Sequence, residues 1–474
     1  MTASFEWGAD EFRAVGHQVV EMAARHLASL PDRPAFAPIP DDVVRLFDSD
    51  GLPMSGAGVD AVLHDFAALV EPWPFGNGHP RFYAWVNPPP HPLGVLAELL
   101  AATMNPSVAG GNHAAVHVER QVVRWFAALA GLPSDAGGLL VSGGSTATLT
   151  GFAAARHRAA ARAGIDVRRD GLQGRRFVLY QGAEGHGSAR KAAELLGIGS
   201  ANIRIVESDP QGRLRPDTLD ELIASDVRDG CVPVAVLASA GTVNTGAIDD
   251  LSAIADVCAR HGVWLHVDAA YGGPAVLLLE RYAAARSGLR RADSIALDPH
   301  KWLYAPVDAG LVLLRDPPVA RDAFSLVPDY LRTDGDGPVW FSEYGFEQTR
   351  PFRALKVWML LKHLGVDGYR SLIEHDLAVA DRLSAQVEAA EDLELLGRGL
   401  SVVCFRANPS GVEDLDALNR RVLSALQLSG EAFLSGTTVD GVFALRACVV
   451  NPRSTSDDAD AVVAAVRALI TPAL

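Results

Sequence analysis

The chain has 474 residues, of which 49% are hydrophobic and 21% charged, a composition typical of a globular protein with two or three domains. Its 42 basic and 57 acidic residues give a net charge of −15, which excludes an extended basic surface for nucleic acid or for an anionic membrane. The four cysteines lie far apart and form no CxxC pair, so neither a zinc site nor a disulfide framework is expected.

No segment predicts membrane insertion or export. Apolar runs fall short of the roughly 20 residues that span a bilayer. The first residues are polar and lack the basic and apolar regions of a signal peptide. We therefore expect a cytoplasmic protein that binds neither nucleic acid nor membrane.

The N-terminal part predicts two amphipathic helices. Apolar residues recur at helical spacing over residues 9–30, where Pro31 ends the run, and again over residues 59–70. Prolines between the two runs predict an extended connection. The apolar faces of both helices need a cover, which is either a second copy of the chain or the body of the same chain.

Residues 78–87 form an irregular stretch that contains Phe82, Tyr83 and Trp85. Aromatic side chains on a loop held by a scaffold suit the wall of a binding pocket. The alternative is a surface loop that prolines brace and that has no binding role.

From residue 138 onward, short apolar runs alternate with helical patterns, which is typical of a wound α/β sheet. Seven strands are predicted, at residues 138–141, 177–180, 203–206, 234–240, 263–267, 294–297 and 310–314. A polar, glycine-containing loop follows at residues 324–338, and then a long helix at residues 350–364. The remaining chain predicts a compact α+β domain, with helices near 373–389, 415–426 and 459–470 and strands at 402–405 and 442–450.

Two of the predicted strands end beside residues that could bind a cofactor. The predicted strand 294–297 leads into a loop with Asp298, His300 and Lys301, and the strand 263–267 is followed by Asp268. A lysine beside a buried strand can lose its proton by desolvation and then form a Schiff base with a carbonyl, although a lone loop lysine is usually only solvated. A carboxylate at a second strand end can pair with a pyridinium nitrogen. The two residues together therefore suit a flat aldehyde cofactor.

These motifs resemble those of a known enzyme family. The sequence HVDAAY at residues 266–271, followed by DPHKW at residues 298–302, is similar to the motif pair of the group II pyridoxal-phosphate-dependent amino acid decarboxylases. This family includes the aromatic-L-amino-acid and glutamate decarboxylases, and the resemblance extends from Glu11 to about Arg453. It implies pyridoxal 5'-phosphate (PLP) as the cofactor and the aspartate-aminotransferase-like fold, PLP fold type I.

The resemblance also implies how the chain is organised. It places a helical dimerisation segment at residues 1–80, a PLP-binding domain with a seven-stranded, mostly parallel sheet at 81–365, and a small C-terminal α+β domain at 366–474. It favours a homodimer with shared active sites, in which residues 105–112 reach the partner's pocket.

Individual residues acquire roles in the same way. Lys301 would attach the cofactor, Asp268 would keep its pyridine nitrogen protonated, and Ala270 would pack beneath its ring. The glycine turn after residue 141 is weak evidence for a phosphate site by itself. With the resemblance, Gly144 and Ser145 become the expected phosphate contacts.

Further site residues are implied with less support from the residues themselves. His186 would stack on the cofactor ring and steer the substrate carboxylate, although a loop histidine is often satisfied by backbone. Thr242 would form a hydrogen bond to the cofactor or the carboxylate, and Asp298 and His300 would lie beside the cofactor. Tyr330 would return a proton to the substrate carbon from a mobile loop; the alternative is an ordinary loop tyrosine.

Some residues depart from the aromatic-amino-acid branch of the family. Asp298 stands where that branch has asparagine, Pro88 stands where threonine is common, and residues 105–112 are smaller and more polar. These differences bear on the substrate more than on the reaction. Four arginines are candidates for binding a carboxylate: Arg81, Arg350, Arg353 and Arg446.

We expect decarboxylation of an L-amino acid to its amine and CO2. The aromatic residues Phe82, Tyr83 and Trp85 favour an aromatic substrate, and a tyrosine at position 330 favours simple decarboxylation over aldehyde formation. Three alternatives stay open: an acidic or basic substrate, a PLP transaminase or aldehyde synthase on the same fold, and a cofactor-free scaffold protein. The joint presence of the lysine, aspartate, histidine and tyrosine counts against the last.

Overall fold

The computed structural model describes residues 6–326 and 340–470. Its central sheet has seven strands in the order β1-β7-β6-β5-β4-β2-β3, all parallel except for β7, which runs antiparallel to β1 and β6. The strands are β1 (Gly137–Val141), β2 (Phe177–Gly182), β3 (Ile203–Val206), β4 (Val232–Ser239), β5 (Trp264–Asp268), β6 (Ser294–Leu297) and β7 (Gly310–Leu314). The predicted wound α/β sheet is confirmed, strand by strand.

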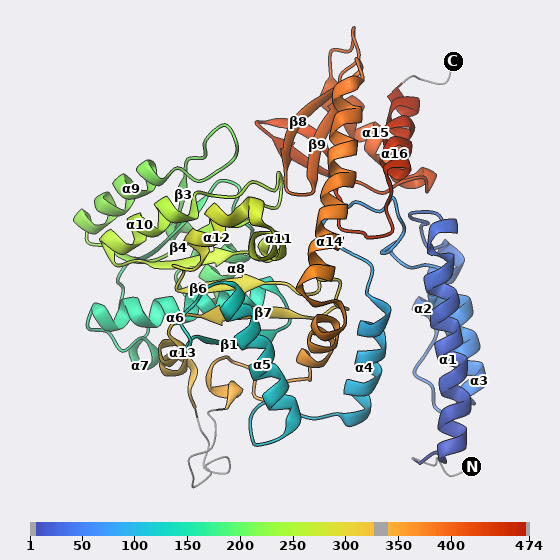
Figure 1. The fold of residues 1–474 in the computed structure, drawn as a ribbon, viewed down its shortest axis with the longest axis horizontal. Coiled ribbons are helices and arrows are strands. Elements are labelled where there is room, and N and C mark those ends of the chain that lie inside the picture. The colour runs from blue at the N-terminus through green and yellow to red at the C-terminus, as the bar shows by residue number, and fades with distance from the viewer. Residues whose placement is uncertain (1–5, 327–339, 471–474) are drawn as a thin grey trace.

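Helices cover both faces of this sheet (Figure 1), with α9, α10 and α12 on one side and α6, α7 and α13 on the other. β6 and β7 are buried along their whole length, as expected for strands covered on both faces. The helices of this domain are α5 (Ala114–Leu129), α6 (Gly144–Arg162), α7 (Val167–Asp170), α8 (Ser188–Leu195), α9 (Pro216–Arg228), α10 (Leu251–His261), α11 (Gly273–Leu278), α12 (Ala283–Leu289) and α13 (Pro317–Phe324). Short 3-10 turns cover Ser200–Asn202, Glu280–Tyr282 and Phe341–Glu343.

The C-terminal part is a second α+β unit with its own core. Its sheet has four antiparallel strands in the order β10-β11-β9-β8. The strands are β8 (Leu393–Gly399), β9 (Val402–Ala407), β10 (Ser435–Val439) and β11 (Val442–Cys448), and the helices are α15 (Leu415–Ser429) and α16 (Ser456–Ile470). β9 and β11 match the two predicted strands, whereas β8 and β10, which are only partly buried, were not predicted.

The helical segment α14 (Ala354–Ala389) joins the two units (Figure 1). It consists of two helices that meet at a kink at Gly365, where the backbone is non-helical and φ is 62°, in agreement with the two helices that the sequence predicts here. Glycine adopts this left-handed conformation without steric cost. The predicted domain limit after residue 365 falls at this kink, and both domain limits stay predictions.

The N-terminal helices stand at one edge of the molecule, beside α4 (Pro92–Met104) (Figure 1). They are α1 (Ala9–Ser29), α2 (Asp41–Ser49) and α3 (Val59–Asp65), followed by a π-helical turn at Phe66–Val70, and α1 is followed by a 3-10 turn at Leu30–Asp32. None of α1, α2 and α3 contributes a buried residue. α2 lies in the connection that was predicted to be extended, and its first turn carries Asp41 and Asp42, which the helix dipole favours.

No helix within residues 6–326 and 340–470 is both long enough and apolar enough to cross a membrane.

Candidate active site

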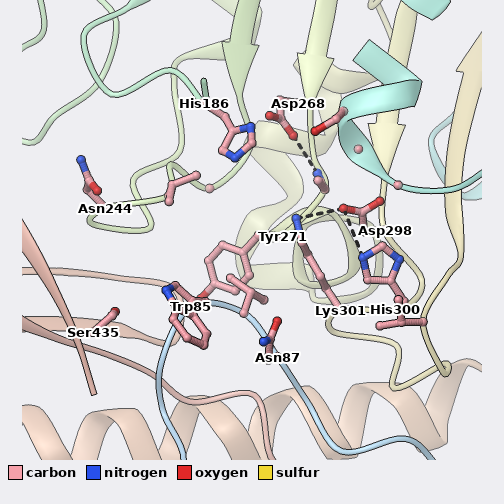
Figure 2. A pocket seen from close by; sticks show the side chains of 18 of the residues that line it. Trp85, Asn87, His186, Asn244, Asp268, Tyr271, Asp298, His300, Lys301 and Ser435 are labelled. Carbon is pink, nitrogen blue, oxygen red and sulfur yellow. Dashed lines mark hydrogen bonds and ion pairs between the residues drawn. The ribbon is translucent and has the colours of Figure 1, made fainter. Parts of the chain in front are cut away.

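A cavity of about 570 Å³ lies at the edge of the large sheet where β1, β2, β4, β5 and β6 end. The loops after these strands line it, together with residues 85–87 and three residues of the C-terminal unit, Ser435, Gly436 and Arg446. Figure 2 shows the lining side chains around Lys301 and Asp298. The carboxyl edge of a wound sheet is the usual place for a ligand.

Lys301 lies in the loop after β6, and its Nζ is 2.9 Å from Asp298 Oδ2. Burial lowers the pKa of the Lys301 ammonium, but the Asp298 and Asp268 carboxylates act in the opposite direction, and the net result is a raised pKa. Desolvation by itself favours the neutral amine, whereas the two carboxylates favour the charged form. The nitrogen must lose its proton before it can attack a carbonyl.

Asp298 is buried beside this lysine. Its Oδ2 lies 3.8 Å from His300 Nε2, and its Oδ1 has no hydrogen-bond partner among the described residues. His300 Nδ1 contacts the carbonyl oxygen of Ala309 at 2.8 Å, and burial lowers the pKa of the His300 ring. An unpaired buried carboxylate oxygen is costly. It therefore marks a point where a bound group can donate a hydrogen bond.

The turn from β1 into α6 closes the cavity next to Asp298. A Cβ atom at Gly144 would lie 3.0 Å from both Ala270 Cβ and Asp298 Oδ2, so glycine keeps this space open. Gly144 and Ser145 begin α6 and line the cavity. The first backbone N–H groups of a helix have no partner within it and attract anions. The turn is thus suited to a phosphate, and the contact itself stays a prediction.

Asp268, Ala270 and His186 also lie on the cavity wall. Asp268 ends β5, and its Oδ1 accepts a hydrogen bond from the Ala270 N–H at 3.1 Å. His186 follows β2, and its Nδ1 accepts from the Ser188 N–H at 3.2 Å, which leaves Nε2 for a ligand. The structure therefore brings together the lysine, the aspartate, the histidine and the glycine turn.

Phe82 and Tyr83 do not reach the cavity. Phe82 stacks on Phe433 at 5.2 Å between ring centroids, and Tyr83 is buried in the C-terminal core. The cause is backbone pairing, because Tyr83 donates to the Phe433 carbonyl and accepts from the Cys448 N–H, both at 2.8 Å. This corrects the prediction that these two residues form a pocket wall. Of the three aromatic residues, Trp85 lines the cavity.

Thr242, another predicted site residue, does not line the cavity. The Thr242 hydroxyl accepts from the Ala247 N–H at 3.0 Å and lies 3.1 Å from Thr245 Oγ1. Its side chain stabilises its own loop, while the neighbouring Gly241, Val243 and Asn244 line the cavity. Tyr330 lies outside the described residues.

Among the four candidate arginines, Arg446 lines the cavity. It is buried, its Nε donates to the Val243 carbonyl at 2.8 Å and its Nη1 to the Trp85 carbonyl at 3.0 Å. Its Nη2 has no partner among the described residues. Arg350 and Arg353 are instead paired with carboxylates elsewhere. The sequence did not predict the lining residues Asn87, Tyr271, Asn244 and Ser435.

A lysine and a carboxylate at the ends of adjacent strands in a wound α/β sheet define the class of PLP-dependent enzymes. Residues 40–408 match the model of the pyridoxal-dependent decarboxylase conserved domain. The chain therefore belongs to the pyridoxal-dependent decarboxylase family, as its two motifs implied, and PLP is its cofactor.

Individual relatives agree with this family. The chain is 33% identical to the aromatic-L-amino-acid decarboxylase of Bacillus atrophaeus, with 99% of this chain and 97% of the relative covered. It is 35% identical to the L-2,4-diaminobutyrate decarboxylase of Rhizobium meliloti (strain 1021), over 86% of this chain and 82% of the relative. The structure of Oryza sativa TDC with PLP and tryptamine superposes with a TM-score of 0.92 at 27% identity, and 99% of each chain is covered.

The residues present fit PLP. The open space at Gly144 lies at the phosphate-suited turn, and Asp268 lines the cavity, where its carboxylate is available to a ring nitrogen. Lys301 lines the cavity and is one of only four lysines in the chain. The other three, Lys191, Lys356 and Lys362, do not line it.

Proposed function

We propose that this decarboxylase acts on an aromatic L-amino acid and releases its amine and CO2. The observation that carries the substrate class is Trp85, which is 45% exposed and lines the cavity. Its ring packs on Phe75 and Phe433, at centroid distances of 5.1 and 6.0 Å. This packing holds an aromatic surface against which a substrate ring can pack. The similarity to an aromatic-L-amino-acid decarboxylase supports the same substrate class.

PLP, when bound, supplies an electron sink for the electron pair left on Cα as CO2 departs. The residues of the chain prepare this step. Lys301 would hold the cofactor covalently after giving up the proton that Asp298 and Asp268 stabilise. Asp268 would hold a proton on the ring nitrogen, and His186 would present Nε2 to the substrate.

Three roles rest on the resemblance or on placement alone. Gly144 and Ser145 would bind the phosphate at the start of α6. Asp298 and His300 would lie beside the cofactor. Tyr330 would return the proton to Cα.

An acidic or basic amino acid is the second candidate substrate. Arg446 offers a buried guanidinium nitrogen without a partner in the described part of the chain, which suits a side-chain carboxylate. The similarity to a diaminobutyrate decarboxylase favours a basic substrate instead.

We also propose that the protein forms a homodimer through its N-terminal helices. Within the described residues, the apolar side chains on α1, α2 and α3 are at most partly covered, and Phe12, Phe47 and Val62 are each more than half exposed. Unpaired apolar surface of this extent is typical of an interaction site. Shared active sites, with residues 105–112 at the partner's pocket, follow from the family resemblance.

The test is a product analysis with PLP-supplemented protein. L-Tryptophan, L-tyrosine, L-phenylalanine, L-glutamate and L-2,4-diaminobutyrate are offered separately, CO2 is trapped and the organic product is identified. We expect CO2 and the amine from the aromatic substrates. CO2 from glutamate or diaminobutyrate alone would overturn the aromatic assignment. A keto acid would indicate a transaminase, and an aldehyde with peroxide an aldehyde synthase.

A further inference from the structure

A buried aspartate on α14 contacts the residues that follow Lys301. Asp376 is fully buried, and its Oδ2 accepts a hydrogen bond from Trp302 Nε1 at 2.8 Å and a second from Tyr304 Oη at 2.7 Å. Trp302 and Tyr304 are themselves buried. One carboxylate oxygen thus binds both aromatic side chains of the segment that carries the lysine.

The backbone of this segment is held by the same helix. Tyr369, also on α14, donates its hydroxyl to the Leu303 carbonyl at 3.1 Å. Tyr304 has a positive φ of 55°, a conformation that a non-glycine residue adopts only when its surroundings stabilise it. Its N–H donates to the Lys301 carbonyl at 3.0 Å. Three consecutive residues after Lys301 are therefore fixed to α14.

The same contacts tie the lysine segment to the Asp268 segment. The Trp302 ring stacks on Tyr271 with 5.2 Å between centroids and an interplanar angle of 12°. The Tyr271 hydroxyl in turn lies 2.7 Å from Ser401 Oγ and accepts from the Ser401 N–H at 3.0 Å. The segment after Lys301 and the segment after Asp268 are therefore both held by contacts with the C-terminal half of the chain.

We propose that Asp376 is a positioning residue for Lys301: through Trp302 and Tyr304 it holds the lysine in the geometry that cofactor attachment and turnover require. This proposal rests on the proposed role of Lys301. Asp376 lies outside the cavity lining and touches neither Lys301 nor Asp298 by hydrogen bond or ion pair within the described residues, so its action on the site is indirect.

If Asp376 only stabilised the fold, its loss would lower the melting temperature without slowing cofactor attachment. Two substitutions at this position distinguish a structural role from a positioning role. Asp376→Leu removes the acceptor and leaves two buried donors unpaired. Asp376→Asn keeps an oxygen that can accept from both. Burial raises the pKa of Asp376 to about 7, although Tyr304 and Trp302 oppose this, so a neutral amide is a mild replacement.

Asp226→Leu is the control for the loss of a buried carboxylate. Asp226 is buried, accepts from the Tyr180 hydroxyl at 3.0 Å and does not line the cavity. Its loss removes a buried hydrogen bond from a tyrosine, as Asp376→Leu does, together with the ion pair to Arg204 at 2.9 Å, and it leaves the lysine segment untouched.

The first measurement is the rate at which cofactor-free protein attaches PLP, followed by visible absorbance. In this step a bond forms between Lys301 Nζ and the aldehyde carbon, and the aldehyde oxygen leaves as water. Melting temperature and the kcat and KM for L-tryptophan are measured on the same samples. We expect Asp376→Leu to slow attachment and to lower kcat by about tenfold or more with little change in KM, because small displacements of a reacting group carry costs of this size. Asp376→Asn should restore both, and Asp226→Leu should lower only the melting temperature.

If Asp376→Leu does not fold, Tyr304→Phe removes one donor and keeps the ring, and Trp302→Phe removes the other donor and replaces the indole by a smaller aromatic ring. The double variant should show the same loss of rate. If Asp376→Leu, or the double variant in its place, attaches PLP as fast as Asp226→Leu does, the positioning role is wrong. A protein that gains no absorbance from PLP, or gains it equally after Lys301→Ala, would overturn the proposed function and this inference with it.

Discussion

Lys301 Nζ lies 2.9 Å from Asp298 Oδ2, and this carboxylate is buried with its other oxygen unpartnered in the described structure. The pair comes from one short loop, three residues apart in sequence. An aspartate at this place contributes a negative charge that the asparagine of the aromatic-amino-acid branch would not. The charge holds the proton of the lysine and lies next to the turn suited to phosphate.

The first prediction concerns the pH dependence of cofactor attachment. Burial lowers the pKa of Lys301, the Asp298 and Asp268 carboxylates raise it, and the net shift is upward. Because only the neutral amine attacks the aldehyde, attachment should become faster as pH rises towards this pKa. Asp298→Asn removes one of the two anions, so the pH profile of the attachment rate should move to lower pH. The rate is measured by visible absorbance across a pH series, and an unchanged profile would show that Asp298 does not control the lysine.

The second prediction concerns substrate choice. Trp85→Ala should lower kcat/KM for L-tryptophan by about tenfold, which corresponds to ~1.4 kcal/mol of lost aromatic contact. Trp85→Phe keeps an aromatic ring and should retain most of the activity. The panel assay on purified variants checks this result. An equal loss for L-2,4-diaminobutyrate and L-tryptophan would contradict an aromatic role for Trp85.

The third prediction concerns the buried pair that anchors β1. Glu119 and Arg350 are fully buried, and Arg350 Nη2 donates to Glu119 Oε1 at 2.5 Å. Glu119 Oε1 also accepts from the Leu140 N–H at 2.9 Å, and Arg350 Nη1 donates to the Val108 carbonyl at 2.8 Å. Glu119→Gln should reduce the free energy of unfolding by about 3–5 kcal/mol, because it leaves a buried guanidinium charge uncompensated.

Chemical denaturation measures this change. Asp460→Asn is the control, since it breaks the exposed pair of Arg382 and Asp460 and should reduce the free energy of unfolding far less. Equal effects of the two substitutions would show that the buried pair does not stabilise the fold.

The fourth prediction concerns assembly. Light scattering should give twice the 50.2 kDa chain mass for the unmodified protein. The double variant Phe12→Asp/Phe47→Asp places charges on exposed apolar positions of α1 and α2, and should reduce the mass to that of one chain. Leu428→Asp, at an exposed position of α15, should leave the dimer intact. A dimer that survives the double variant would place the interface elsewhere.

The large sheet could be predicted from sequence because most of its strands are buried on both faces and therefore appear as short apolar runs between helical patterns. β6 and β7 were predicted with their observed bounds. β8 and β10 were missed because they are only partly buried and contain glycine and polar residues. Their apolar pattern was too weak to distinguish them from loops.

Most of the predicted residues that line the cavity sit at strand ends, and Trp85 and Arg446 were predicted as well. Ser435 and Gly436 reach the cavity from the C-terminal unit, and no local pattern records that approach. Phe82 and Tyr83 show the converse, because aromatic residues on an irregular segment suit a core as well as a pocket. The burial of Asp376 could have been predicted from the sequence. This residue shares a helix face with the buried Ile373, Leu377 and Ala380, where a charged residue needs buried partners.

The most direct test of the account is to find where the cofactor is attached. Borohydride reduction of the PLP-loaded protein fixes the covalent bond between lysine and cofactor, and digestion with mass spectrometry then locates the added mass among the four lysines. We expect the added mass on the peptide that contains Lys301, and none on the peptides of Lys191, Lys356 and Lys362. Added mass on one of those three lysines, or none after incubation with PLP, would contradict it.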